Sequence, residues 1–339
     1  MSFSNQTAIT KIRSMYGKML KESQYLNMLN YNKIEEIVDF LKNNTHYKNS
    51  FNILEKSEIT ENIIENLIKQ ETFLNYKKIY RYANKNKIIK FFIKHIEMNE
   101  ILKIMLIVTG NKNKKYFVDL PKYLVKKCKI KLFNLVNVNT FDELLKHLKN
   151  TKYEKIVLDF KRENKEINYL KFEHILYKKF FEEFFKTIKA KANNVELFEL
   201  NKLLKTRIDN INLCYIYREK IIFDTDSKKI KENIFNFHKN LTSIKLEKIL
   251  ASQEKSQLEE NFKNIYKNFK NFKIEEVEKY ANKIEYLMCR HYINLSLNLT
   301  TVFYCFYVLQ QIEIKNLIHI IEGVRYNLKK EEIKTYLTI

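Results

Sequence analysis

The stretch that decides the fold is EIKNLIHIIEGV, Glu313–Val324, because the chain contains two other versions of it. EMNEILKIMLIV begins at Glu97 and DNINLCYIYREK begins at Asp209. In each stretch an acid is followed, three residues later, by a polar residue and then by an apolar run at helical spacing. The copies recur about every 110 residues, which is the length of a small domain and not of a solenoid unit of ~20–50 residues. A triplicated helical domain is typical of proteins that bind or connect other molecules.

The spacing divides the chain into three predicted helical repeats, residues 1–115, 116–225 and 226–339. A second echo supports the division, because FDELLKHLKNTKY (141–153) resembles IEEIVDFLKNNTHY (34–47). The whole chain has only 3 Gly and 1 Pro, too few for the many tight turns of an all-β protein. We therefore predict an all-α fold of long helices joined by polar loops.

Three local features add detail to the predicted all-α fold: a possible short strand, two glycines at helix ends and one proline at a repeat boundary. KIKLFNLVN (129–137) is compatible with a short strand before the helix that starts at Phe141. Gly110 and Gly323 are each expected to end an apolar helix, as glycine often does in a left-handed conformation. Pro121, the only proline, marks the expected junction between the first two repeats.

The net charge of +22 has two interpretations. Lys, Asn and Ile are used heavily throughout, as expected from an A+T-rich genome with a solvated lysine surface. Alternatively, the charge serves an acidic protein partner, lipid headgroups or nucleic acid. A basic helical-repeat protein that binds RNA or DNA stays open as an alternative, although such a protein should gather its basic residues on one concave face, whereas lysine is spread over all three repeats.

No pattern typical of an active site is found in the sequence. Three glycines cannot supply a Walker A loop or a GxGxxG turn, and HExxH and GxSxG are absent. The histidines lack metal-ligand spacing, and the four cysteines form no CxxC pair, so we expect reduced, buried thiols. We predict no catalytic, cofactor or metal site. The longest apolar runs are far shorter than the ~20 residues that span a bilayer, so a soluble or peripheral protein is expected.

The order and spacing of three motifs resemble the C subunit of the V/A-type rotary ATPases, which is named the d subunit in the eukaryotic enzyme. The opening ITKIRSMYGKMLKESQYLNML (9–29) is similar to the family's start, and RIDNINLCYIYREK (207–220) is similar to its middle motif. The closest match is the C-terminal IEIKNLIHIIEGVRYNLKKEEIKTYL (312–337). The first repeat departs from the pattern, with Glu100 where the family more often has Asn.

The resemblance implies a funnel of three related helical domains with pseudo-threefold symmetry around a central pocket. It implies a non-catalytic coupler without cofactor, present as one copy per complex at the cytoplasmic face of the membrane. Its expected partners are the rotor shaft and the membrane ring of ion-carrying subunits, and no nucleic acid. Whether the ring carries protons or sodium stays open. From the repeat we predict that seven polar residues line the socket: Glu97, Asp209, Asn212, Arg218, Glu313, Asn316 and Arg325. A capped, buried helix in each repeat is the simpler interpretation of the same motif, and the two are compatible.

Overall fold

The computed structural model describes residues 3–52, 60–83, 90–110, 120, 125–163, 167–236, 240–267 and 269–339. These residues form sixteen α-helices and no strand, which confirms the all-α prediction. They divide into two compact units, Met1–Ala83 with Asn193–Ile339 and Asn84–Ala192. Pro121 and the predicted boundary after residue 115 lie outside the described residues.

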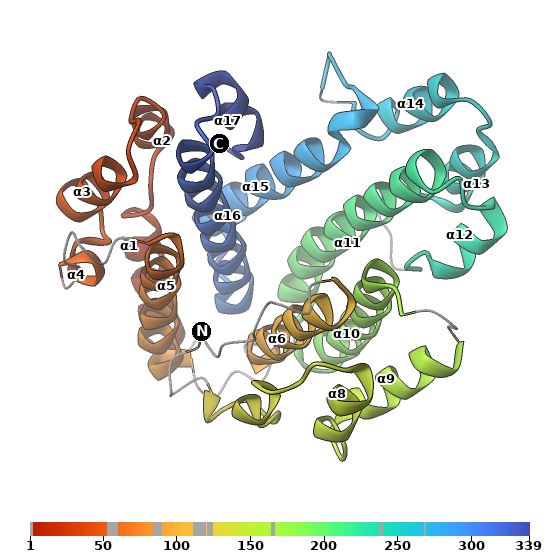
Figure 1. Cartoon of the computed structure of the whole chain (residues 1–339), viewed down its shortest axis with the longest axis horizontal. Helices are drawn as coiled ribbons and strands as arrows, with labels where there is room; N and C mark the ends of the chain where they lie inside the picture. The colour runs from red at the N-terminus through yellow and green to blue at the C-terminus, as the bar shows by residue number, and fades with distance from the viewer. Residues whose placement is uncertain are drawn as a thin grey trace. The chain divides into compact units, whose positions relative to one another are not determined.

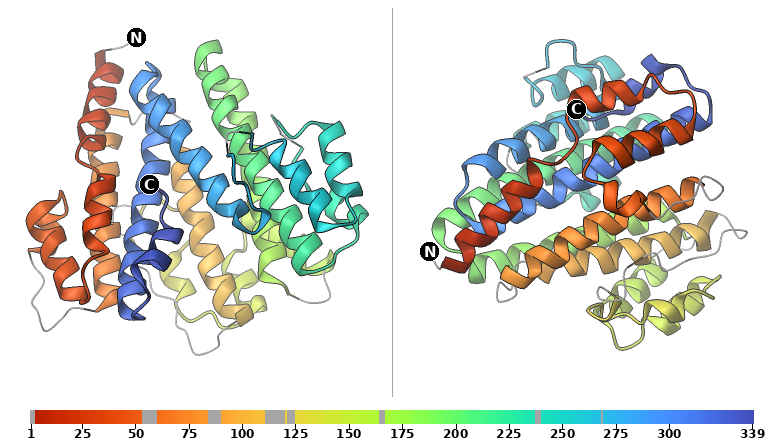
Figure 2. Two further views of the ribbon diagram at one scale, coloured as in Figure 1. Left: turned by 90° about the horizontal axis from the view of Figure 1, so that it is seen from above. Right: turned by 90° about the vertical axis from the view of Figure 1, so that its left-hand side faces the viewer.

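The larger unit is built around α16 (Leu299–Arg325), a helix of 27 residues (Figure 1). It packs against α1 (Phe3–Tyr16), α5 (Glu61–Ala83) and α15 (Val277–Leu295). These helices lie side by side in the two further views (Figure 2). Residues on every side of α16 are buried, so this helix is the centre of the unit and not an amphipathic surface helix.

The second half of α16 carries its own small core. Helices α2 (Glu22–Met28), α3 (Ile34–Asn44) and α4 (Lys48–Phe51) pack there together with α17 (Lys330–Tyr336). Ile64 and Ile68 of α5 also belong to this core, so all of its helices except α16 and α17 come from a segment far from α16 in the sequence. Buried side chains of both segments form one cluster, which includes Leu41, Phe51, Leu317 and Ile333.

The end of α11 (Asn194–Tyr217) carries a comparable core in the same unit. This core contains α12 (Ser227–Asn233), α13 (Ser243–Ala251), α14 (Lys255–Lys263) and the 3-10 turn Ile274–Glu276. The last turn of α11 continues as a π-helical segment, Arg218–Ile222. Asn193 caps α11, because its side chain accepts a hydrogen bond from the Glu196 amide at 2.9 Å.

The smaller unit contains α6 (Lys90–Gly110), α8 (Phe141–His147), α9 (Lys152–Glu163) and α10 (Tyr169–Lys191). Helices α6 and α10 pack together through aromatic side chains, among them Phe91 stacked on Phe184 with ring centroids 4.8 Å apart. The predicted strand in 129–137 is wrong, because Leu132–Leu135 is a 3-10 turn. Leu132 and Leu135 are both buried from that turn, which one turn allows at a spacing of three.

Neither glycine expected to end a helix does so in a left-handed conformation. No glycine among the described residues has positive φ, and α16 continues beyond Gly323 to Arg325. Gly323 is needed for packing instead, because a Cβ there would lie 2.5 Å from Cγ1 of the buried Ile333. A Cβ at Gly110, the last residue of α6, would meet nothing within 4 Å.

Candidate functional site

The acid of each repeated motif is buried and accepts a backbone hydrogen bond. Glu97, Asp209 and Glu313 are at most 3% exposed. Asp209 Oδ2 accepts from the Asn240 amide at 2.6 Å, and Glu313 Oε2 accepts from the Leu20 amide at 2.7 Å. Glu97 Oε1 accepts in the same way from the Lys129 amide. Because a buried carboxylate is costly without hydrogen-bond donors, these contacts explain why the acid recurs in the motif.

A buried tyrosine donates to the acid in two of the copies and to the residue beside the acid in the third. Tyr153 donates its hydroxyl to Glu97 at 3.1 Å, and Tyr47 donates to Glu313 at 2.8 Å. In the middle copy the Tyr266 hydroxyl lies 3.2 Å from the Asn210 side chain, directly beside Asp209 in the sequence. Burial raises the pKa of all three tyrosines, and nearby acidic groups raise it further. The hydroxyls therefore stay protonated and donate hydrogen bonds. We call each copy of this arrangement a clasp: the motif helix, the backbone amide bonded to its buried acid, and the buried tyrosine.

The fourth residue of the motif holds a backbone segment in two of the copies. Asn212 donates to the Phe235 carbonyl and accepts from the Phe235 amide, both at 3.0 Å. Asn316 makes the same pair of bonds with Thr338, both at 2.9 Å. In the first copy the position is Glu100, whose carboxylate pairs with Lys103 at 2.6 Å. Glu100 therefore forms an ion pair within one helix at the position where the other two copies hold a distant backbone segment.

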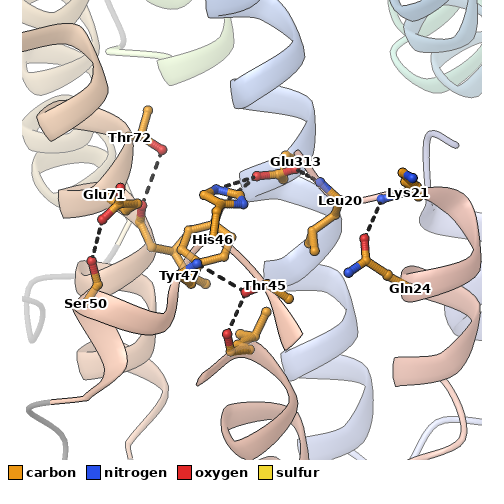
Figure 3. Close-up of polar contacts among 12 residues, drawn as sticks. Leu20, Lys21, Gln24, Thr45, His46, Tyr47, Ser50, Glu71, Thr72 and Glu313 are labelled. Carbon is orange, nitrogen blue, oxygen red and sulfur yellow. Dashed lines mark hydrogen bonds and ion pairs between the residues drawn. The ribbon is translucent and has the colours of Figure 1, made fainter. Parts of the chain in front are cut away.

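The clasp of the third copy has one more participant (Figure 3). His46 Nε2 lies 3.5 Å from Glu313 Oε1, beside the Tyr47 hydroxyl and the Leu20 amide. Burial raises the pKa of Glu313, whereas His46 and the two hydrogen bonds oppose the rise. This clasp joins residues that are 293 and 266 positions apart, so it connects the first fifty residues to α16.

The structure separates the seven predicted socket residues into two groups. Five are buried in the clasps: Glu97, Asp209, Asn212, Glu313 and Asn316. The other two stand at the ends of α11 and α16, where Arg218 is partly exposed and Arg325 is exposed. Arg218 pairs with Glu278 through Nε at 3.0 Å, and the Arg325 guanidinium lies 5.6 Å from the Tyr326 ring. Contact of any of the seven with a partner stays a prediction.

Sequence reasoning missed the three clasp tyrosines, although a signal for two of them was present. Tyr47 and Tyr153 close the two echoing segments NNTHY and KNTKY. Their shared position indicates a shared contact, whereas Tyr266 lies in a segment that resembles them little.

The clasps are accompanied by no arrangement that suits a metal ion. The described residues contain no group of three or more His, Cys, Asp or Glu side chains placed to hold one. Within that part of the chain, no helix combines the length and the apolar character that crossing a membrane requires.

Nearly the whole chain matches one protein family. The family described as ATP synthase (C/AC39) subunit matches residues 8–336. The chain therefore belongs to this family, as the resemblance to the C subunit of the V/A-type ATPases predicted. No curated protein matches the chain.

Proposed function

We propose that the chain is a non-catalytic central-stalk subunit of a V/A-type ATPase, a socket that couples the rotor shaft to the membrane ring. The family match along residues 8–336 carries the proposal, because it makes the other ATP synthase subunits the partners. In this role one copy per complex lies against the cytoplasmic face of the membrane. It transmits torque between ATP turnover and the movement of protons or sodium, and holds no nucleotide itself.

The clasps support this role through stiffness. A coupler that yields under load would lose torque, and α11 and α16 are 24 and 27 residues long. Each is tied to a separate segment by a buried carboxylate and a doubly bonded asparagine. Buried hydrogen-bonded networks of this kind hold one arrangement, because breaking them leaves unsatisfied polar groups.

The experiment is reconstitution of the chain with purified shaft subunits at low and at high salt. A stoichiometric complex supports the proposal, and its loss at high salt assigns the interface to charge. The variant that reverses Arg218 and Arg325 to Glu should bind the shaft more weakly and remain folded. Its control reverses Lys231 and Lys279, two exposed lysines paired with glutamates, so the net charge changes equally.

The absence of a complex at either salt, with nucleic acid bound to the chain instead, would contradict the proposal and favour the basic nucleic-acid-binding alternative. Unchanged affinity of the arginine variant would remove Arg218 and Arg325 from the interface and would not affect the coupling role.

A further inference from the structure

The smaller unit presents a basic segment, residues 125–135, which leads from the first clasp toward α8. The segment contains no acidic residue and four exposed lysines: Lys126, Lys127, Lys129 and Lys131. Phe133 follows the lysines and is 64% exposed. A single exposed aromatic side chain is ordinary on a protein surface, but this one adjoins four lysines with no acid among them.

The backbone of the basic segment is anchored to the unit. Ile130 and Leu132 are buried, and the Lys129 amide donates to Glu97 in the first clasp. Exposed and buried positions alternate from residue 129 to residue 133, so two lysines and the phenylalanine face outward. The exposed side chains are therefore presented by a fixed backbone.

The other two clasps close without such a segment. In the middle copy α13 begins shortly after the clasp amide of Asn240, and in the third copy α2 begins shortly after that of Leu20. In the first copy α8 begins only at Phe141, well after Lys129. The lysines and the phenylalanine of the basic segment therefore need an explanation other than the clasp.

Acidic side chains of the unit leave the charge of the segment in place. Three of its lysines form no ion pair with any described residue: Lys126, Lys129 and Lys131. Glu97 and Glu100 of α6 are buried. The two acids at the start of α8 are engaged, because Asp142 pairs with Lys161 and Glu143 accepts from two backbone amides. The segment therefore presents a positive charge toward solvent.

This combination fits an anionic lipid surface better than nucleic acid or an acidic protein. Lysines near a membrane are attracted to anionic headgroups, and an exposed aromatic side chain enters the boundary between headgroups and acyl chains. Single-stranded nucleic acid is bound by several aromatic side chains on which successive bases stack, whereas the segment offers only Phe133. A stable protein interface takes ~20–30 residues a side, and six residues of the segment are exposed.

We propose that the basic segment binds the anionic lipid surface of the membrane. The lysines contact the headgroups, and Phe133 enters the boundary between headgroups and acyl chains. This inference rests on the proposed function, which has the chain lie against the membrane. Because lipids are fluid, contact with them does not hold back a subunit that turns with the rotor, whereas contact with a fixed protein would.

The test is sedimentation of the full-length chain with vesicles of phosphatidylcholine alone and of phosphatidylcholine mixed with phosphatidylserine. Wild type should bind only the mixed vesicles, and high salt should release it. K129Q/K131Q should weaken this binding roughly 30-fold, since each lysine near an anionic surface is worth about a factor of five. The matched control, K186Q/K189Q, removes two exposed lysines of α10 in the same unit and should stay within about twofold of wild type. All four positions are exposed, so urea unfolding of both variants should match wild type.

A second measurement tests Phe133 directly. The chain contains no tryptophan, so F133W introduces a unique fluorophore. Its emission should shift to the blue with the mixed vesicles and be quenched by brominated lipids, as expected for a side chain that leaves water. The control Y336W, at a position of α17 that is 56% exposed, should show neither change.

Three results would overturn the proposal. The first is equal binding of K129Q/K131Q and wild type to the mixed vesicles, and the second is unchanged emission of F133W. Both leave the coupling role intact, because the shaft assay contains no lipid. The third is preference of the chain for an RNA or DNA oligonucleotide over the mixed vesicles. Failure of wild type to bind the shaft would contradict the coupling role alone, and the vesicle measurements would still decide whether the basic segment binds lipid.

Discussion

Substitution of Asn212 by Ala tests the clasp most directly. The side chain is fully buried and bonds to both backbone groups of Phe235. In the variant, the Phe235 amide and carbonyl lose their partner in a place that water does not reach. Each buried unsatisfied group costs about 1–3 kcal/mol, so the loss of stability should be roughly 2–6 kcal/mol.

Asn316→Ala is the matched comparison. It removes the same two bonds, but their partner Thr338 is only half-buried, whereas Phe235 is buried. The freed backbone groups of Thr338 can bond to water after a small movement, so the loss should be only about 1 kcal/mol. The two variants are chemically identical, and the difference between them isolates the effect of burial.

The assay is urea unfolding together with hydrogen exchange of α12, which lies between Asn212 and Phe235 in the sequence. Each 1.4 kcal/mol is a factor of ten, so N212A should reduce protection of α12 by roughly 30- to 20,000-fold. N316A should leave α12 unchanged and reduce protection of α17. Equal losses in the two variants, or a loss below about 0.5 kcal/mol in N212A, would refute the assignment of the asparagines as backbone anchors.

Three further predictions concern other parts of the chain. Burial raises the pKa of Glu313, so its ionisation costs stability as the pH rises above the ordinary carboxyl range. The stability of E313Q relative to wild type, measured by urea unfolding, should therefore increase as the pH rises above about 4, and a difference that is constant with pH would contradict this. G323A should lose about 1–3 kcal/mol through collision with Ile333, I333A should cancel much of that loss in a double-mutant cycle, and G110A should lose nothing. Burial raises the pKa of Cys214 to about 12, so this thiol should react with a thiol reagent at pH 8 only after unfolding, and rapid labelling of the folded chain would disprove it.

The helical class could be predicted from the sequence because apolar spacing records which face of a helix is buried. The apolar runs of the three motifs became α6, the end of α11 and the second half of α16. The repeat also singled out seven polar residues, five of which are buried in the clasps. It could not show what they contact, because a carboxylate bonded to an amide 31 or 32 residues away leaves no periodic trace.

The errors have the same physical origin. The sequence predicts that Gly323 ends a helix through its own backbone conformation. In the structure, glycine is needed there because Ile333 of another helix fills the space that a Cβ would take. The short apolar stretch in 129–137 is compatible with a strand, yet without a neighbouring strand a 3-10 turn buries Leu132 and Leu135 equally well. Predictions from local sequence preference are correct where neighbouring residues determine the structure, and wrong where a contact with a distant segment determines it.

The third clasp shows how far such a distant contact reaches. Glu97 and Asp209 are clasped by segments that follow them closely in the chain, whereas Glu313 is clasped by Leu20 and Tyr47, which precede it by 293 and 266 positions. Because closing a loop of this length costs entropy that local contacts do not repay, this core cannot form until α16 is present. The larger unit should therefore acquire its stability late, when α16 has been synthesised and buries Glu313 against the first segment of the chain.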